Sequence, residues 1–222
     1  MEKHIVKVLA TRMVTHNVKQ FDIEKPNGYK FIPGQATDVS LNRPGLEDDL
    51  HPFTFTSLND WGNLQFTIKM YTDHDGMTSK LQDINTGNEL ILHEVFGAIN
   101  YKGPGLFVAG GAGVTPFIAI LRQEYKDGKI GGSKLLFANR SVEDIILHDE
   151  FEMMLGDNFI NITDKSDDPK VMQGHIDKPL LQKYVSDDMQ YYYVCGPDQF
   201  TIDMVEYLKE LGVPESSIVT EQ

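Results

Sequence analysis

The first 102 residues alternate apolar and polar side chains over short segments that turn-forming residues separate. A period of two is typical of strands that bury one face. The segments that we expect to be strands are 5–15, 18–23, 36–41, 53–57, 64–71 and 89–92. One short helix is expected over 78–83. Strands at this spacing predict a small antiparallel β-barrel.

The pattern changes after residue 102, where continuous apolar runs alternate with segments of helical periodicity. The apolar runs are 106–109, 134–138, 159–163 and 191–195, and the helical segments are 116–125, 144–154, 179–184 and 198–211. Strands that are apolar throughout and alternate with helices predict a parallel sheet covered on both faces. We therefore expect two domains, a β-barrel over 1–102 and an α/β domain over 103–222.

The composition agrees with two globular domains and excludes several functions. A chain of 222 residues with 41% hydrophobic and 24% charged residues can bury two cores. The net charge of −13 argues against nucleic-acid binding, which needs a surplus of Lys and Arg. The single cysteine, Cys195, excludes an internal disulfide and a protein-ligated iron–sulfur or zinc centre. We see no signal peptide and no apolar stretch that spans a membrane, so we expect a cytoplasmic protein without a metal site.

A glycine-rich loop follows the first apolar run of the second half. Residues 106–109 lead into Gly110-Gly111-Ala112-Gly113-Val114-Thr115-Pro116 and then into a predicted helix. Backbone N–H groups at a helix start, with no Cβ atom in the way, are what a diphosphate needs. The alternative is a tight turn of an ordinary α/β domain, since the loop is not the dinucleotide fingerprint GxGxxG.

A second motif, Tyr193-Val194-Cys195-Gly196-Pro197, lies at the end of the last apolar run. Taken alone, Cys195 is better explained as a small buried hydrophobe. Together the two motifs resemble the NAD(P)-binding signatures of the ferredoxin–NADP reductase superfamily. The resemblance implies that Cys195, with Gly196 and Pro197, lies beside the nicotinamide and helps to position it for hydride transfer.

The first half carries a matching flavin motif. His51-Pro52-Phe53-Thr54 resembles the Arg-x-Tyr-Ser/Thr motif of the same family, in the form found in ferric reductases and NADPH oxidases. The resemblance places His51 at the FAD diphosphate, Phe53 beside the flavin and Thr54 near flavin N5. Histidine lacks the permanent bidentate charge of arginine, so flavin affinity is expected to be weaker or pH dependent. The alternative is a hairpin strand with a solvent-facing histidine.

Two further segments favour the flavin interpretation over that alternative. The strand Ile68-Lys69-Met70-Tyr71 is expected to line the flavin, and Gly76-Met77-Thr78 resembles the turn that opens a short helix toward the diphosphate. Four motifs therefore occur in family order. The family commonly ends in a Glu-x-aromatic tail. Here Glu221 aligns with the acid, while the covering aromatic is missing, so the resemblance assigns no residue to shield the flavin.

The resemblance implies a flavin-dependent oxidoreductase that passes electrons from NAD(P)H through FAD to a one-electron acceptor such as flavodoxin or ferredoxin. Its catalytic residues would be Thr54, Cys195 and Glu221. The alternatives are a nucleotide-binding electron-transfer subunit without independent turnover and a structural protein. Acidic acceptors would need a local basic patch, because the chain itself is acidic. The candidates for that patch are Lys3, Lys7, Arg12, Lys19, Lys25 and Lys30.

The choice between NADH and NADPH depends on the end of the second strand of the α/β domain. Asn139, Arg140 and Ser141 stand where the adenosine ribose would lie, and no acid is placed to hold a 2′-hydroxyl. Arg140 and Ser141 could bind a 2′-phosphate, whereas Glu143 and Asp144 would repel it. Residues 137–147 resemble the NADH-using cytochrome b5 reductases, so we favour NADH.

Overall fold

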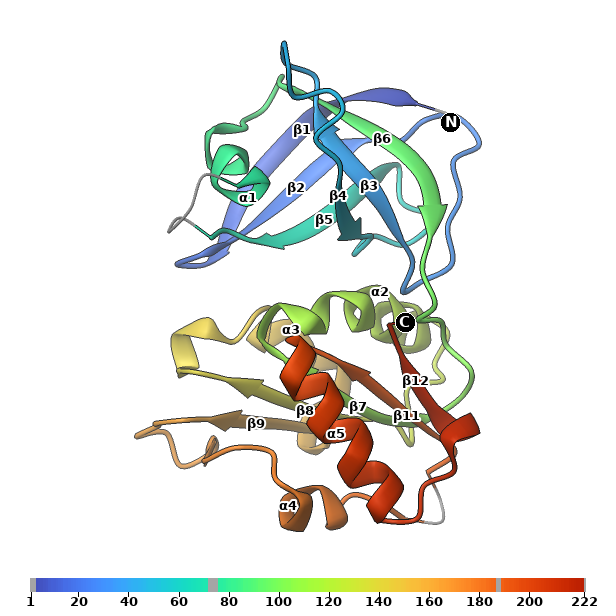
Figure 1. Cartoon of the computed structure of the whole chain (residues 1–222), viewed down its shortest axis with the longest axis vertical. Coiled ribbons are helices and arrows are strands. Elements are labelled where there is room, and N and C mark those ends of the chain that lie inside the picture. Colours follow the sequence, from blue (N-terminus) through green and yellow to red (C-terminus); the bar gives the residue numbers. More distant parts are fainter. Residues whose placement is uncertain (1–2, 72–75, 187–188, 222) are drawn as a thin grey trace.

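The structure, a computed structural model, describes residues 3–71, 76–186 and 189–221. Two sheets lie one above the other along its longest axis, the N-terminal one at one end and the C-terminal one at the other (Figure 1). The predicted fold class is confirmed: an antiparallel sheet precedes a parallel one. Within the described residues, no helix is long and apolar enough to cross a membrane.

The N-terminal sheet has six strands whose pairings are all antiparallel. They are β1 (His4–Thr15), β2 (Val18–Glu24), β3 (Ala36–Leu41), β4 (His51–Thr54), β5 (Asn63–Lys69) and β6 (Glu89–Phe96), in the order β4-β3-β6-β1-β2-β5. A bridge between Phe55, just after β4, and Phe66 of β5 joins the two edges of the sheet. The sheet therefore closes on itself, as the expected barrel requires.

Alternate side chains of the barrel strands point inward, as the period of two predicts. Phe21, Ile23 and Phe66 are fully buried in the barrel core, and the rings of Phe55 and Phe66 stack with their centroids 5.2 Å apart. Outward-facing Gln20 is also buried, with 1% of its surface exposed. The second domain covers this outer face, since its Arg122 donates to Gln65 beside Gln20.

A short helical segment closes one end of the barrel. It comprises α1 (Met77–Lys80) and the 3₁₀ turn η1 (Leu81–Asp83). Lys19 holds its C-terminal end, since its Nζ donates to the carbonyl oxygens of Gln82 at 2.9 Å and Ile84 at 2.7 Å. Burial lowers the pKa of the Lys19 ammonium. The Lys19 side chain is therefore buried, and the prediction that Lys19 belongs to a basic surface patch for an acidic acceptor is wrong.

The C-terminal sheet also has six strands, and all its pairings are parallel. The strands are β7 (Gly105–Gly110), β8 (Lys134–Asn139), β9 (Phe159–Thr163), β10 (Met172–Gln173), β11 (Tyr191–Cys195) and β12 (Ile218–Thr220), in the order β10-β9-β8-β7-β11-β12. Its helices are α2 (Thr115–Lys126), α3 (His148–Leu155), α4 (Lys178–Gln182) and α5 (Asp198–Glu210). Four shorter 3₁₀ turns are η2 (Gly111–Val114), η3 (Val142–Asp144), η4 (Gly156–Asn158) and η5 (Glu215–Ser217).

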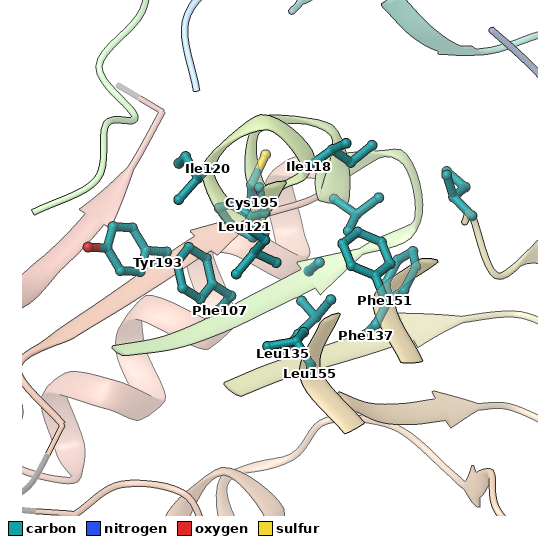
Figure 2. Close-up of a cluster of buried hydrophobic side chains, with 14 of the residues drawn as sticks. Phe107, Ile118, Ile120, Leu121, Leu135, Phe137, Phe151, Leu155, Tyr193 and Cys195 are labelled. Atoms are coloured by element: carbon teal, nitrogen blue, oxygen red, sulfur yellow. The ribbon is translucent and has the colours of Figure 1, made fainter. Parts of the chain in front are cut away.

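The parallel sheet separates two hydrophobic cores. Phe107, Phe137 and Tyr193 pack against α2 and α3 on one face, and Figure 2 shows Phe107 next to Tyr193 and Phe137 next to Phe151 within this cluster. On the other face, Val108 and its neighbours pack against residues of α4 and α5. Every residue of β7 is buried, which explains its continuous apolar run.

One helix is shorter than its periodicity predicted. The helix expected over 144–154 begins only at His148, because Ile145 is extended and Leu147 takes a left-handed φ of 52°. Ile145 and Ile146 are 4% and 1% exposed, so two consecutive side chains are buried in the core. Their burial stabilises an irregular turn in place of the first helical turn. The short strands β10 and β12 were not predicted.

Candidate functional site

A cleft of about 1460 Å³ lies between the two sheets and receives side chains from both. The predicted site residues that line it are Pro52, Phe53, Thr54, Ile68, Lys69, Met70, Tyr71, Thr78, Gly110, Gly111, Gly113, Thr115, Asn139, Arg140, Cys195, Gly196, Pro197 and Glu221. Residues as far apart in the sequence as Pro52 and Glu221 therefore meet in one cavity. Both the flavin motif and the nucleotide motifs contribute to its wall.

Four predicted residues do not line the cleft. His51 Nε2 lies 3.0 Å from Asp49 Oδ1. Met77 is buried with 2% of its surface exposed, Gly76 precedes α1, and Pro116 is buried in the first turn of α2. Pro116 fits its place because the first turn of a helix does not use its missing N–H. The binding roles of these four residues stay predictions.

Thr54 is the polar side chain that β4 presents to the cleft. It is partly buried next to Phe53, and its hydroxyl makes no hydrogen bond to any other described residue. The backbone of β4 is paired with β3, with Thr54 opposite Ala36. A rigid strand thus presents a free hydroxyl to the cavity, where a bound ring could accept or donate a hydrogen bond.

The glycine loop forms the opposite wall. An added Cβ at Gly113 would lie 2.4 Å from the Cys195 carbonyl oxygen and 2.5 Å from the Gly196 nitrogen. At Gly110 it would lie 3.2 Å from Phe200. Gly111 has a φ of +52° and would meet no atom within 4 Å. The loop therefore packs tightly on the end of β11 while it leaves open space before the N-terminus of α2, which is the shape that a diphosphate requires.

Cys195 and Glu221 lie together at the cleft wall, at the ends of neighbouring strands β11 and β12. In Figure 2 the Cys195 sulfur points away from the rings of Phe107 and Tyr193. Burial is the largest cause that raises the pKa of the Cys195 thiol, and the adjacent Glu221 carboxylate raises it further. Loss of solvation raises the pKa of the Glu221 carboxyl, and the hydrogen bond to Cys195 opposes that shift. Cys195 is thus a neutral thiol with a carboxyl group as its hydrogen-bond partner.

The far end of the cleft carries mixed charge. Arg140, Asp144, Asp164 and His16 line it, and His16 Nε2 lies 3.8 Å from Asp144 Oδ1. Asn139 is 9% exposed, and its buried Nδ2 has no hydrogen-bond partner among the described residues. A buried donor without a partner costs about 1–3 kcal/mol, so this amide is suited to a ligand acceptor.

Sequence reasoning missed two aromatic residues at the cleft. Phe200, in the first turn of α5, lies against Gly110 and Gly196, and Phe96 ends β6 with 42% of its surface exposed. A signal was present for Phe200, because it follows Gly196-Pro197 at the start of a predicted helix. None was present for Phe96, whose strand was predicted to end at residue 92.

Two family models match the chain. Residues 3–114 match the model of an FAD-binding domain, and residues 107–206 match that of an oxidoreductase NAD-binding domain. The reductase component of propane 2-monooxygenase from Rhodococcus jostii is 27% identical over 87% of this chain and 56% of its own length. Ferredoxin–NADP reductase B from Sorangium cellulosum is 27% identical over 97% of this chain and 96% of its own length.

The fold also matches a solved structure. The crystal structure of a ferredoxin NADP⁺ reductase from Neisseria gonorrhoeae with bound FAD and NADP superimposes with a TM-score of 0.86. It is 17% identical and covers 100% of this chain and 98% of its own. This likeness concerns the fold. The present chain spans little more than half of the propane 2-monooxygenase reductase component, at 56%.

Proposed function

The chain belongs to the ferredoxin–NADP reductase superfamily, and from this premise we propose that it transfers hydride from NADH to FAD and passes the electrons singly to a protein acceptor. The observation that carries the proposal is the shared cleft, in which Thr54 of the flavin motif and Cys195 of the nucleotide motif both form the wall. FAD supplies the coupling between a two-electron donor and one-electron acceptors. We place the division between the two domains at residues 102 and 103.

The predicted site residues form groups according to the part of each ligand that they would contact. His51, Gly76, Met77 and Thr78 would hold the FAD diphosphate, and Pro52, Phe53 and residues 68–71 would enclose the flavin. Gly110, Gly111, Gly113, Thr115 and Pro116 would hold the nicotinamide dinucleotide, with Asn139 and Arg140 at its adenosine. The orphaned Asn139 Nδ2 and the open space at Gly111 support this fit.

Three residues would act at the reacting rings. Thr54 would orient the flavin through its free hydroxyl, while Cys195 would hold the nicotinamide with Gly196 and Pro197. Glu221 would offer its carboxyl group beside the Cys195 thiol, and loss of solvation raises the pKa of that carboxyl. The protein's contribution is orientation of the two rings at contact distance.

The acceptor we propose is a small iron–sulfur or flavin carrier, or the oxygenase component of a multicomponent system. Relatives named as reductase or electron-transfer components support this choice. Of the candidate cations, Lys7 and Lys30 remain exposed for such a contact. Lys3 pairs with Asp48, Arg12 Nε donates to Gln20 Oε1, and Lys25 donates to the Asn59 carbonyl oxygen. We place the protein in the cytoplasm, whose reducing conditions keep the single thiol reduced.

The proposal is tested by mixing the FAD-loaded protein with NADH or NADPH in an anaerobic stopped-flow instrument and following flavin absorbance. We expect rapid bleaching, followed by reoxidation when ferricyanide, a ferredoxin or a flavodoxin is added. A yellow protein that neither nucleotide bleaches would instead support a binding subunit without turnover. A protein unable to take up FAD would exclude the proposal.

NADH is expected to be the better donor by about tenfold or more in kcat/KM, a difference of about 1.4 kcal/mol. Asp144 and Asp164 line the same cleft as Arg140, and the Ser141 hydroxyl is occupied because it donates to Asp144 Oδ2 at 3.0 Å. A 2′-phosphate would therefore meet one exposed cation and two acids. The measurement is kcat/KM for NADH and NADPH with ferricyanide, in the wild type and in Arg140→Ala.

Lys183→Ala is the matched control, because it removes an exposed cation at the end of α4 that does not line the cleft. We expect Arg140→Ala to leave the preference for NADH in place and the control to change nothing. A tenfold wild-type preference for NADPH that disappears in Arg140→Ala, and persists in the control, would overturn the assignment.

A further inference from the structure

A buried arginine crosses from the α/β domain into the barrel. Arg122 lies in the last half of α2 and is 7% exposed. Its Nη1 donates to the Thr56 carbonyl oxygen at 2.6 Å and to Gln65 Oε1 at 2.8 Å, and both acceptors belong to the barrel. Its Nε and Nη2 donate to the two carboxylate oxygens of Glu150 in α3 at 2.5 and 2.8 Å. Four of the five N–H donors of one guanidinium are thus used, two in each domain.

The barrel surface that receives Arg122 is polar and buried. Gln20, Gln65 and Thr67 face outward from β2 and β5, yet they are only 1%, 5% and 4% exposed. Gln20 Nε2 donates to Gln65 Oε1 at 3.2 Å and to Thr67 Oγ1 at 3.1 Å, and the Thr56 and Thr67 hydroxyls are 3.1 Å apart. A buried polar network stabilises one arrangement only when its members are satisfied. Arg122 supplies a charged donor to this network from the other domain.

The elements that carry this hydrogen-bond network reach the cleft from both domains. Helix α2 lies on the side of the α/β domain that faces the barrel, and it begins directly after the glycine loop (Figure 1). Thr56 is two residues beyond Thr54, and Thr67 itself lines the cleft. One side chain therefore connects the element that begins at the nucleotide loop with the strands that would hold the flavin.

We infer that Arg122 is a positioning residue, which sets the distance and angle between the nucleotide-binding loop and the flavin strand. The kinetic part of this inference rests on the proposed function. Its physical basis is that hydride transfer needs the two rings in contact, so a displacement of about 1 Å can cost about 100-fold in rate. Lysine cannot replace the planar guanidinium of Arg122. Its ammonium is a compact donor that cannot bond Glu150, Thr56 and Gln65 in fixed directions.

The chain offers a matched control on the same helix. Lys126, one turn after Arg122, forms an ion pair with Asp60 of the barrel, but the two side chains are 48% and 56% exposed. Exposed ion pairs contribute little to stability. Lys126→Met thus removes a cross-domain cation of similar length without disturbing the buried network.

The test compares Arg122→Met, Arg122→Lys and Lys126→Met as full-length proteins loaded with FAD. Three quantities are measured: the flavin-reduction rate at saturating NADH, the NADH dissociation constant from the concentration dependence of that rate, and hydrogen exchange of backbone amides. We expect about a tenfold lower rate in Arg122→Met, with FAD content unchanged and the dissociation constant within about twofold. The flavin-reduction rate of Arg122→Lys should lie between those of Arg122→Met and the wild type, and the rate of Lys126→Met should equal that of the wild type.

Hydrogen exchange gives a readout that does not depend on turnover. In Arg122→Met the amides of 54–56, 65–67 and 118–122 should exchange faster, while those of α4, which packs on the other face of the parallel sheet, should not change. If the wild type is not reduced by either nucleotide, the proposed function fails and hydrogen exchange alone decides whether Arg122 holds the domains. If Arg122→Met does not fold, Arg122→Lys and Glu150→Gln carry the comparison. Wild-type rates and wild-type exchange in the folded variants would overturn the inference.

Discussion

Gly113→Ala is expected to weaken NADH binding by about 100-fold or more, the largest effect of any single methyl group in the cleft. The added Cβ would lie 2.4 Å from the Cys195 carbonyl oxygen and 2.5 Å from its carbonyl carbon, so it overlaps backbone atoms that no rotamer change can move. Relief of the overlap must separate the glycine loop from the end of β11. That movement displaces the nucleotide loop and Cys195 together, and a loss of about 2.7 kcal/mol corresponds to 100-fold.

Two glycines with left-handed backbones separate this clash from conformational strain. Gly111, in the cleft, has a φ of +52°, and Gly128, beyond the end of α2, has a φ of +67°; an added Cβ at either would meet no atom within 4 Å. Alanine costs about 1–2 kcal/mol of backbone strain at such positions. Gly128→Ala should therefore lower the stability of the fold without an effect on NADH affinity. Gly111→Ala should lower both stability and NADH affinity, and its loss of affinity should be smaller than that of Gly113→Ala.

The measurement is NADH affinity by titration of flavin fluorescence or absorbance, with FAD content recorded for each variant. FAD should remain bound in all three variants, because the flavin strands belong to the barrel. Wild-type NADH affinity in a folded Gly113→Ala protein would contradict the placement of the nucleotide loop. Loss of FAD with NADH affinity unchanged would contradict the assignment of the two domains to their ligands.

Thr54→Val is expected to slow flavin reduction at saturating NADH by about 100-fold while FAD stays bound. Valine keeps the shape of threonine and removes the hydroxyl, which has no hydrogen-bond partner among the described residues and faces the cleft. Loss of one preorganised hydrogen bond at a reacting atom typically costs about 100- to 1000-fold in rate. We expect the smaller loss of about 100-fold in the reduction rate, because the other cleft residues still orient the two rings.

Thr54→Ser provides the control for this variant, since it restores the hydroxyl on a smaller side chain. Its reduction rate should return to within about fivefold of the wild type. The measurement is the anaerobic single-turnover rate, with FAD content checked by absorbance. Equal rates in Thr54→Val and the wild type would show that Thr54 does not act at the flavin, whereas equal loss in both variants would indicate a packing defect.

The sequence by itself was enough to predict the fold class and the positions of most strands. Continuous apolar runs such as 106–109 arise because a parallel strand is covered on both faces, and alternation around Phe21 and Phe66 arises because a barrel strand has one buried face. The glycine loop is also a local signal, because its glycines stand directly between an apolar strand and a helix that begins with Thr115-Pro116. Each of these features depends on a residue and its neighbours in the chain.

Other features depended on contacts between distant segments, and only the tertiary structure decided them. The helix expected from residue 144 begins at His148 because Ile145 and Ile146 are both drawn into the core. Lys19, counted as a surface cation, is buried because the carbonyl groups at the end of η1 accept its hydrogen bonds. Arg122 gave no signal in its helical periodicity, since its partners lie 28 to 66 residues away. A side chain's own chemistry predicts what it can bind, but its partners depend on how the two domains pack, and no local pattern contains that information.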